Sequence, residues 1–466
     1  MVFLWCFLPI TLFFYYIIDK KFKNGFLLFA SLVFYFWGEP SYIIVLLSSI
    51  VFNYFIARLM DKGEGGRRKM LLIVAVLGNI FLLGYFKYFN FMVEALNMIA
   101  GKEQFVFKHV ALPIGISFYT FQSLSYIVDL YNKKIEVQKN ILNLALYIAL
   151  FPQLIAGPIV KYKDIDTQLS EREENAEKFA EGIRRFIIGL GKKVIIANTL
   201  ATAADKAFTC NAGEISQQLA WCGIICYTLQ IYYDFSGYSD MAIGLGKMFG
   251  FDFLENFNIP YISRSIREYW RRWHMSLSGW FKDYVYIPLG GNRHGEARTL
   301  VNLFLVFLLT GIWHGAGFTF IVWGAYHGLF VVLERAFLGK ILEQEKFKIL
   351  SHIYMLSVVT LGFVIFRADT LSHAGGYFKA MFLGNQNVLW NMLEAADIHT
   401  AIAFVLAILC SGFFVPLKDR ITAKIKAAAG ENAYQISCSI GLIFIFAWCI
   451  LKLISGTYNP FIYFRF

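Results

Sequence analysis

The chain has 466 residues, of which 58% are hydrophobic and only 16% are charged. This composition lies far outside the range of soluble domains and excludes a water-soluble globular protein. The formal net charge of +11 comes mostly from short basic loops, and no segment resembles a nucleic-acid-binding module, so no nucleic-acid partner is expected. The class that remains is an integral membrane protein.

Apolar segments recur along the whole chain, and a helix needs about 20 residues to cross a bilayer. No internal repeat and no linker rich in proline or serine divides these segments, so we expect one polytopic all-α domain over residues 1–466. Some segments are short: 26–38 covers only about 20 Å as a helix, and we therefore expect roughly eleven to thirteen crossings. The expected spans are 2–18, 26–38, 41–57, 71–90, 111–128, 141–157, 185–201, 217–233, 300–312, 318–335, 353–367, 400–415 and 436–455.

Basic residues gather in alternate loops, which by the positive-inside bias face the cytoplasm. The connection 38–41 has no Lys or Arg and is expected outside together with the N-terminus, and the first apolar segment lacks a cleavage pattern and is expected to remain as a span. Basic residues before the last span place the C-terminal tail outside, and the charged segment 163–185 is expected to be a solvated helical connector. The basic residues are Lys20, Lys21, Lys23, Arg58, Lys62, Arg67, Arg68, Lys69, Lys133, Lys134 and Lys139 in the first three loops, and Lys418, Arg420, Lys424 and Lys426 before the last span.

Two histidines stand in the apolar segment GIWHGAGFTFIVWGAYHG, residues 311–328. His314 precedes Gly-Ala-Gly, and its ring is expected at membrane depth, where small neighbours leave room for a ligand or for another backbone. An ionisable group at that depth indicates a functional site, because burial keeps imidazole in the neutral form that serves as a general base. A hydrogen-bonded core histidine is the alternative. His327 lies about 20 Å further along a continuous helix, so the two rings are not expected to share one reacting group.

Residues 261–298 form a basic, aromatic-rich stretch with seven Lys or Arg and three acids. Because guanidinium groups match phosphate oxygens, its cations are predicted to receive a phosphate-bearing donor such as a thioester of coenzyme A. The alternative is an interfacial anchor, since tryptophans alternate with arginines at helical spacing. His274, which ends the run WRRWH, is expected either to take a chemical role in the core or to be a hydrogen-bonded interfacial residue. The predicted donor-binding residues are Arg267, Arg271, Arg272 and Lys282, and the tryptophans are Trp270, Trp273 and Trp280.

Two acids, Asp234 and Asp240, lie in the run YYDFSGYSD within a long apolar region. Acids in such a place either line a polar path or pin two helices together, and the nearby hydroxyls of Ser236 and Ser239 favour the structural role. No set of His, Cys, Asp and Glu has the spacing of metal ligands, so no metal site is expected.

The terminal hexapeptide FIYFRF, residues 461–466, is almost wholly apolar. Such a segment suits insertion into a cavity better than disorder in water, and an aromatic anchor at the membrane surface is the alternative. Tyr463 within it offers a phenol nucleophile that a nearby base such as His314 would activate.

Four segments of the chain strongly resemble the membrane-bound O-acyltransferase superfamily: EYWRRWHMSLSGWFKDYVYIPLGGNRHG, LTGIWHGAGFTFIVWGAYHG, YYDFSGYSDMAIG and LPIGISFYTFQSLSYIVDLY. The resemblance is to its branch of bacterial alginate-type polysaccharide O-acetyltransferases and teichoic-acid D-alanylation proteins, and it covers essentially the whole chain. It implies a ring of helices around a central tunnel, with the family's two histidines at His314 and His274 and an acyl-accepting tyrosine at Tyr463. We expect Asp234, Ser236 and Trp313 to line this tunnel.

The resemblance therefore implies a multi-pass O-acyltransferase of a bacterial inner membrane. It would hold no bound cofactor and would use acetyl-CoA or another acyl thioester as donor substrate. The acyl group would pass by way of Tyr463 to an extracytoplasmic SGNH-type partner and then to a cell-surface polysaccharide such as alginate or another exopolysaccharide. Two alternatives remain open: D-alanyl transfer to teichoic acid from an acyl-carrier protein, and a non-enzymatic transporter of a glycan precursor, against which the lack of an internal repeat argues.

Overall fold

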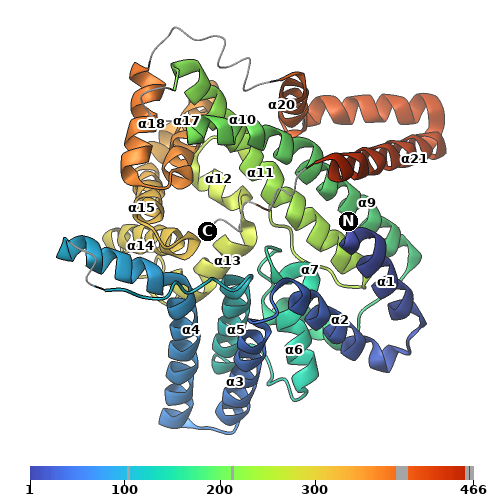
Figure 1. Ribbon diagram of the computed structural model, residues 1–466, viewed down its shortest axis with the longest axis vertical. Coiled ribbons are helices and arrows are strands. Elements are labelled where there is room, and N and C mark those ends of the chain that lie inside the picture. The colour runs from blue at the N-terminus through green and yellow to red at the C-terminus, as the bar shows by residue number, and fades with distance from the viewer. Residues whose placement is uncertain (102–104, 211–214, 385–396, 457–460, 462–466) are drawn as a thin grey trace. The chain divides into compact units, whose positions relative to one another are not determined.

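In the computed structural model, the residues described are 1–101, 105–210, 215–384, 397–456 and 461 (Figure 1). Every regular element within these ranges is a helix, which confirms the all-α class. Seven of the described helices are long and apolar enough to cross a membrane, and two shorter apolar helices accompany them, so the chain is a polytopic membrane protein. The expected eleven to thirteen crossings stay a prediction. The seven are Ile43–Asp61, Gly65–Ala100, Ala176–Thr209, Glu296–His314, Phe318–Leu342, Glu345–Arg367 and Asp419–Ser455, and the shorter two are Phe3–Ile17 and Ile398–Cys410.

The chain divides into two compact units. The N-terminal unit consists of Met1–Ile183 and Ala242–Leu254, and the C-terminal unit consists of Arg184–Met241 and Glu255–Phe466. Two of the three boundaries fall inside long helices, α9 (Ala176–Gly191) and α11 (Gln217–Met248), each of which therefore contributes to both units.

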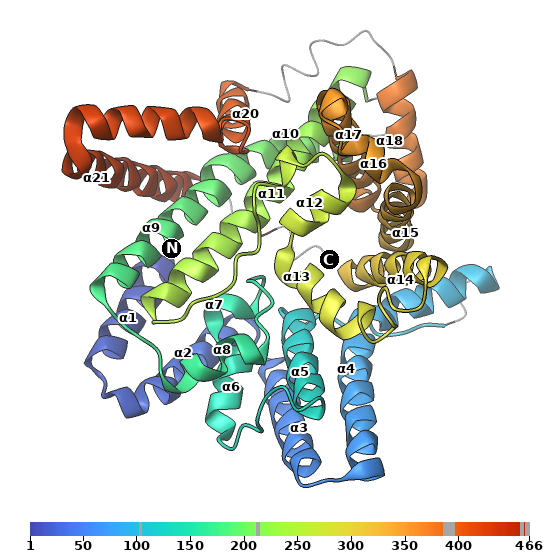
Figure 2. The same ribbon diagram turned by 180° about the vertical axis from the view of Figure 1, so that it is seen from behind.

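In the N-terminal unit, α5 is the central helix, because almost all of its residues are buried. It packs against α3 and α4, and the three lie side by side in both views (Figures 1 and 2). Only four of the 36 residues of α4 are buried, as expected of a helix that faces lipid. The helices of this unit before α9 are α1 (Leu8–Ile17), α2 (Lys23–Gly38), α3 (Ile43–Asp61), α4 (Gly65–Ala100), α5 (Ile116–Tyr131), α6 (Ile141–Ala149), α7 (Phe151–Leu154) and α8 (Tyr162–Ser170).

Two hydrogen bonds join helix ends and a loop near the basic loops of the N-terminal unit. The guanidinium of Arg68 donates to the carbonyl of Leu130 at 2.7 Å, which ties the start of α4 to the end of α5. The hydroxyl of Tyr54, on the last turns of α3, donates to the carbonyl of Lys139 at 2.7 Å. Two loops that the charge bias assigns to the same side of the membrane therefore lie at the same end of this unit.

Two expected segments differ from the structure. The span 141–157 is wrong as one helix, because it breaks at Leu150 into α6 and α7, where Pro152 cannot continue the hydrogen bonding of the helix before it. The segment 163–185 is helical, in α8 and α9, and most side chains from 173 to 184 are exposed, as expected of a solvated connector, but its last residue departs from this pattern. Arg185 there pairs with Asp240 of α11 at 2.9 Å, a counter-charge that the local sequence does not show.

The core of the C-terminal unit is built mainly from α10, α11, α12 and α17, with contributions from α15 and α20. A glycine with φ of 82°, Gly430, kinks the long C-terminal helix α21 into two legs that run back on each other in Figures 1 and 2. The helices of this unit, besides α9 and α11, are α10 (Asn198–Thr209), α12 (Ile266–Arg272), α13 (Met275–Phe281), α14 (Glu296–His314), α15 (Phe318–Leu333), α16 (Gly339–Leu342), α17 (Lys348–Arg367), α18 (Leu371–Leu383), α20 (Ile398–Cys410) and α21 (Val415–Ser455).

Helices α14 and α15 form a tight hairpin because glycines let their backbones touch. A Cβ atom at Gly311 would lie 2.4 Å from the carbonyl oxygen of Phe320, and one at Gly324 would lie 2.6 Å from that of Phe307. The side chain of Phe320 fills the space beside Gly315 in the same way. The small residues left two possibilities open, namely room for a ligand or room for another backbone. At these glycines the space is taken by the neighbouring backbone and by Phe320.

We expect Gly324→Ala to destabilise the protein, because the added methyl group must push α14 and α15 apart. Overpacking of this kind costs roughly 1–3 kcal/mol and should lower the midpoint of thermal unfolding of the detergent-solubilised protein. Gly441→Ala in α21 is the matched control, because its Cβ atom would meet nothing within 4 Å. Equal unfolding midpoints for the two variants would contradict the packing described for this hairpin.

Candidate active site

His314 lies in a buried aromatic pocket at the end of α14. Its ring centroid is 5.0 Å from that of Trp313, 5.1 Å from Trp323 and 5.3 Å from Phe366. Gly315, directly after it, takes an extended conformation, and the chain reverses into α15, which brings Trp323 back against the imidazole. Only 7% of the residue is exposed, so the ring is largely removed from solvent, as the sequence predicted.

His274 joins α12 to α13 in the left-handed backbone conformation, with φ of 44° and ψ of 54°. This region costs a residue with a Cβ atom about 1–2 kcal/mol, so the surrounding structure must hold it there. Its Nδ1 atom lies 3.0 Å from Oδ1 of Asn256. The hydroxyl and the backbone N–H of Ser276 donate to the same oxygen, at 2.9 and 3.3 Å.

These contacts determine which nitrogen of His274 carries the proton. The atom of Asn256 that faces the ring must be its carbonyl oxygen, because the backbone N–H of Ser276 can only donate to it. Nδ1 of His274 therefore donates, and Nε2 keeps its lone pair. That Nε2 atom is buried and has no hydrogen-bond partner among the residues described, while burial lowers the pKa of His274 to about 3. His274 is thus a neutral imidazole with a lone pair that points into the protein.

Trp313 brings the two predicted histidines together. Its ring lies 6.2 Å from that of His274 and 5.0 Å from that of His314. His274, Trp313 and His314, which were predicted as site residues from two separate motifs, therefore form one cluster in the C-terminal unit.

His327 also belongs to this cluster, and the sequence analysis missed it. The 20 Å separation from His314 assumed a continuous helix, but the helix breaks between α14 and α15. Both rings consequently contact Trp323, with centroid distances of 5.1 Å for His314 and 4.9 Å for His327. On its other side His327 meets Trp270 of α12 at 5.2 Å. The glycines of the connecting turn were the signal that could have indicated the reversal.

Both acids of α11 form ion pairs with basic residues at the end of α9 and in the π-helical turn Lys192–Ala197. Asp234 lies 2.6 Å from Nζ of Lys193, and both side chains are buried. Asp240 lies 2.7 Å from Lys192 and 2.9 Å from Arg185. Both acids therefore hold two helical segments together, which is the structural role that the sequence favoured.

The two serine hydroxyls expected near these acids, those of Ser236 and Ser239, have other surroundings in the structure. Ser239 lies next to Asn256, which donates its Nδ2–H to the serine oxygen at 3.0 Å. The hydroxyl of Ser236 is buried and forms no hydrogen bond with any residue in the described ranges. Ser239 therefore supports the His274 network, through Asn256.

Phe461, the first residue of the C-terminal hexapeptide, packs on the C-terminal unit close to Asp234. Its ring centroid is 4.7 Å from that of Tyr238 on α11, and Nζ of Lys193 lies 4.7 Å from the same centroid. Tyr463 and the rest of 462–466 fall outside the described residues. The start of the hexapeptide therefore contacts the same lysine that pairs with Asp234.

Three of the predicted donor-binding cations, Arg267, Arg271 and Arg272, lie on α12, whereas Lys282 begins the π-helical turn Lys282–Tyr286 after α13. The tryptophans Trp270, Trp273 and Trp280 are buried, so the alternative of a flat interfacial anchor does not describe this segment. Arg272 pairs with Glu268 at 3.0 Å, and Arg267 is half-buried with its backbone N–H donating to Glu334 at 2.9 Å. Arg271 and Lys282 are exposed.

The fold and the cluster define a polytopic helical membrane protein with buried imidazoles in its C-terminal unit. Residues 67–367 match the family model described as MBOAT, membrane-bound O-acyltransferase family. The chain belongs to this family and is an O-acyltransferase. The matched region contains His274, His314 and Asp234, and it ends before the C-terminal hexapeptide.

Relatives with assigned names agree with this membership. The chain is 42% identical to the probable alginate O-acetylase of Pseudomonas putida, over all of this chain and 99% of that protein. It is 38% identical to a peptidoglycan O-acetyltransferase of Helicobacter pylori, over 82% of this chain and 78% of that protein. It is 30% identical to a teichoic acid D-alanyltransferase of Bacillus subtilis, over 56% of this chain and 70% of that protein.

Asn256 offers a test of His274 that does not remove the imidazole. Asn256→Asp keeps an acceptor for Nδ1–H but adds a negative charge, which raises the pKa of His274. If neutral His274 is required, the acidic limb of the pH dependence of acyl transfer should move to higher pH. Asn256→Ala should instead lower the rate about 10- to 100-fold at all pH values, as loss of a supporting hydrogen bond does in comparable sites.

Ser276→Ala is the control for these variants, because it removes one hydrogen bond to Asn256 and leaves the bond to His274 in place. Its pH profile should match that of the unmodified protein. A pH profile of Asn256→Asp that also matches would show that the protonation of His274 is not coupled to acyl transfer.

Proposed function

We propose that this O-acyltransferase passes an acetyl group from cytoplasmic acetyl-CoA, by way of Tyr463, toward a cell-surface polysaccharide. The observation that carries the proposal is the pair of buried imidazoles, His274 and His314, on either side of Trp313. The relatives that align over most of this chain are named as O-acetylating proteins of alginate and of peptidoglycan, which supports acetyl as the group and a polymer hydroxyl as its final acceptor. An extracytoplasmic SGNH-type protein is the proposed intermediate carrier, and the bacterial inner membrane is the proposed location.

In the proposed first step, the phenol oxygen of Tyr463 attacks the thioester carbonyl carbon while His314 takes the phenol proton. The carbon–sulfur bond then breaks, and the proton passes from the imidazolium to the leaving thiolate, so the products are coenzyme A and an acetyl ester of Tyr463. In the second step, a hydroxyl of the extracytoplasmic partner attacks this ester and restores the phenol. His274, with its Nε2 lone pair available, is proposed as a second proton acceptor at the same site.

Two further features support the route. Phe461 is held on α11 by Tyr238 and Lys193, which anchors the chain two residues before the proposed nucleophile. Arg271 and Lys282 are exposed, so their charges are available to the phosphates of a coenzyme A donor. Arg272 is less suitable for that role, because its charge is already paired with Glu268.

Transfer of D-alanine from a carrier protein is the second candidate. It rests on the teichoic acid D-alanyltransferase of Bacillus subtilis, which aligns with only 56% of this chain. Acetyl transfer is favoured because the O-acetylating relatives align over more of the chain at higher identity.

His314→Ala should leave the protein folded and reduce acetylation of the C-terminal peptide by roughly 100- to 10,000-fold, the usual contribution of a general base. The assay incubates purified protein with radiolabelled acetyl-CoA and follows label on the C-terminal peptide by mass spectrometry. His399→Ala is the matched control, because this histidine is exposed on α20. Undiminished labelling of His314→Ala would remove the proposed base.

Tyr463→Phe should abolish the acetyl ester on the C-terminal peptide and, in cells, acetylation of the polysaccharide, because only the phenol oxygen is lost. Tyr458→Phe is the control from the same tail and should retain both. Normal polysaccharide acetylation by Tyr463→Phe would mean that the acetyl group takes a route without this residue, and the tail would then act only as an anchor.

A further inference from the structure

A cavity of about 770 Å³ opens in the N-terminal unit, away from the histidine cluster in sequence and not used by the proposed reaction. It lies where the start of α2, the start of α6 and the end of α8 converge. Its volume is in the range of ligand sites in proteins. Its polar lining includes Lys20, Lys21, Asn24, Asn143, Arg172 and Glu174.

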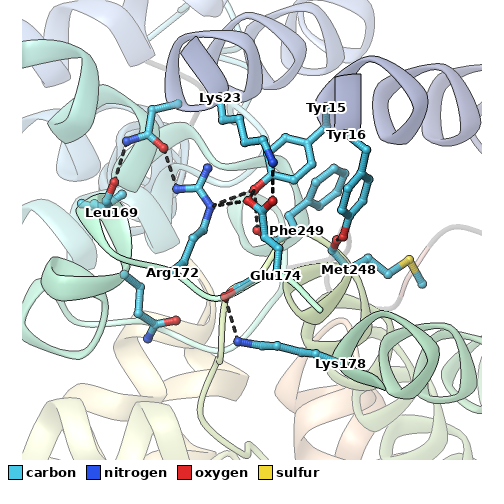
Figure 3. A network of polar contacts seen from close by, with 12 residues as sticks. Tyr15, Tyr16, Lys23, Leu169, Arg172, Glu174, Lys178, Met248 and Phe249 are labelled. Atoms are coloured by element: carbon cyan, nitrogen blue, oxygen red, sulfur yellow. Dashed lines mark hydrogen bonds and ion pairs between the residues drawn. The ribbon is translucent and has the colours of Figure 1, made fainter. Parts of the chain in front are cut away.

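The wall of this cavity is held by a network of polar contacts (Figure 3). Arg172 donates from Nε to the hydroxyl of Tyr15 at 2.8 Å and from Nη1 to Oδ1 of Asn24 at 2.6 Å. The carboxylate of Glu174 is paired with Lys23 and lies 3.7 Å from Nε of Arg172. The one acid in the lining is therefore already neutralised by groups that the structure fixes in place.

The charge left at the cavity is positive. Lys20 and Lys21 are exposed, and Lys20 forms no ion pair with any residue that the structure describes. The ammonium of Lys21 lies 4.9 Å from the ring centroid of Phe22, which keeps it at the edge of an apolar surface. Two cations thus face a cavity whose acid is satisfied, which is the electrostatic requirement for binding an anion.

The surface beside the cavity is apolar and exposed. Phe22, which lines the cavity just before α2, exposes more than half of its surface, as do Ile17 at the end of α1 and Phe29, one turn after the lining residue Phe26 on α2. The cavity is lined by the loop before α2, which is itself basic, and by the start of α6, which follows the basic loop 133–139. The charge bias places both basic loops on the cytoplasmic side. A basic cavity that borders a lipid-facing apolar surface has the features of a phospholipid headgroup site.

We propose that this cavity binds the headgroup of an anionic phospholipid of the cytoplasmic leaflet. Lys20 and Lys21 contact its phosphate, and its acyl chains lie along the exposed side chains of Ile17 and Phe29. A soluble nucleotide phosphate would meet the same cations, but it would leave the adjoining apolar surface uncovered, so the lipid is favoured. The proposal is independent of the acyl-transfer route.

The test titrates the purified full-length protein with phosphatidylglycerol and counts retained lipid by native mass spectrometry, with phosphatidylcholine as the neutral comparison. Lys20→Gln combined with Lys21→Gln should weaken retention of phosphatidylglycerol about tenfold or more, since each lysine near a headgroup contributes roughly a factor of five. Lys62→Gln combined with Arg67→Gln is the matched control, because it removes the same charge from another basic loop outside the cavity. Retention by this control should be unchanged.

Gly25→Phe tests the volume of the cavity without changing its charge. Gly25 lines the cavity on α2, and a Cβ atom there meets nothing within 4 Å, so a side chain can be added at this position and is expected to occupy part of the space. It should weaken retention as strongly as the lysine variants. Equal losses in both charge variants, undiminished retention by Gly25→Phe, or displacement of the lipid by adenosine 3′,5′-bisphosphate would each overturn the lipid assignment.

Discussion

The close approach of α14 and α15 is the constraint on which the histidine cluster depends. Gly311 and Gly324 allow the two backbones to touch, and the turn between the helices then places Trp323 against the ring of His314. If larger side chains separated the helices, Trp323 and His327 on α15 would move away from His314 on α14, and the aromatic enclosure of His314 would open. The enclosure keeps the ring of His314, which is only 7% exposed, away from bulk water, as the proposed reaction requires. Backbone packing is therefore part of the electrostatics of the site.

A second constraint is the neutralisation of charge inside a membrane protein. A single buried charge at membrane depth costs about 3 kcal/mol or more, so the acids of α11 need partners. The π-helical turn Lys192–Ala197 supplies them by presenting two successive lysines toward α11, one to Asp234 and one to Asp240. Lys193 also lies over the ring of Phe461, and the same ion pair thereby helps to hold the start of the C-terminal hexapeptide. A contact that stabilises helix packing thus also supports the proposed placement of the acceptor.

The helical class, the choice of His274 and His314 as site candidates and the pinning role of Asp234 could be predicted from the sequence. Each of these predictions depends on local hydropathy or on the cost of burying a polar group. Other features depend on distant partners and could not be predicted in this way. His327 joined the cluster only because the chain reverses after His314, and a helix estimate cannot show a reversal. Asn256 is an ordinary polar residue in sequence, and its role became visible only when its oxygen was found between His274 and Ser276. The left-handed conformation of His274 likewise breaks what the pattern indicated as one amphipathic helix.

The contact of Phe461 with α11 matters for the nucleophilic role proposed for the phenol of Tyr463. With Phe461 held on α11, the Cα atom of Tyr463 is confined to within about 7 Å of that of Phe461, because two residues of extended chain reach no further. If the proposed nucleophile is Tyr463, this tether would make its attack effectively intramolecular, and well-placed groups of this kind react as if present at very high concentration. A weak nucleophile near neutral pH can then be sufficient, provided that a neutral imidazole takes its proton in the transition state. In the proposed reaction, the tethered tail would supply proximity and the buried histidine cluster would supply the base.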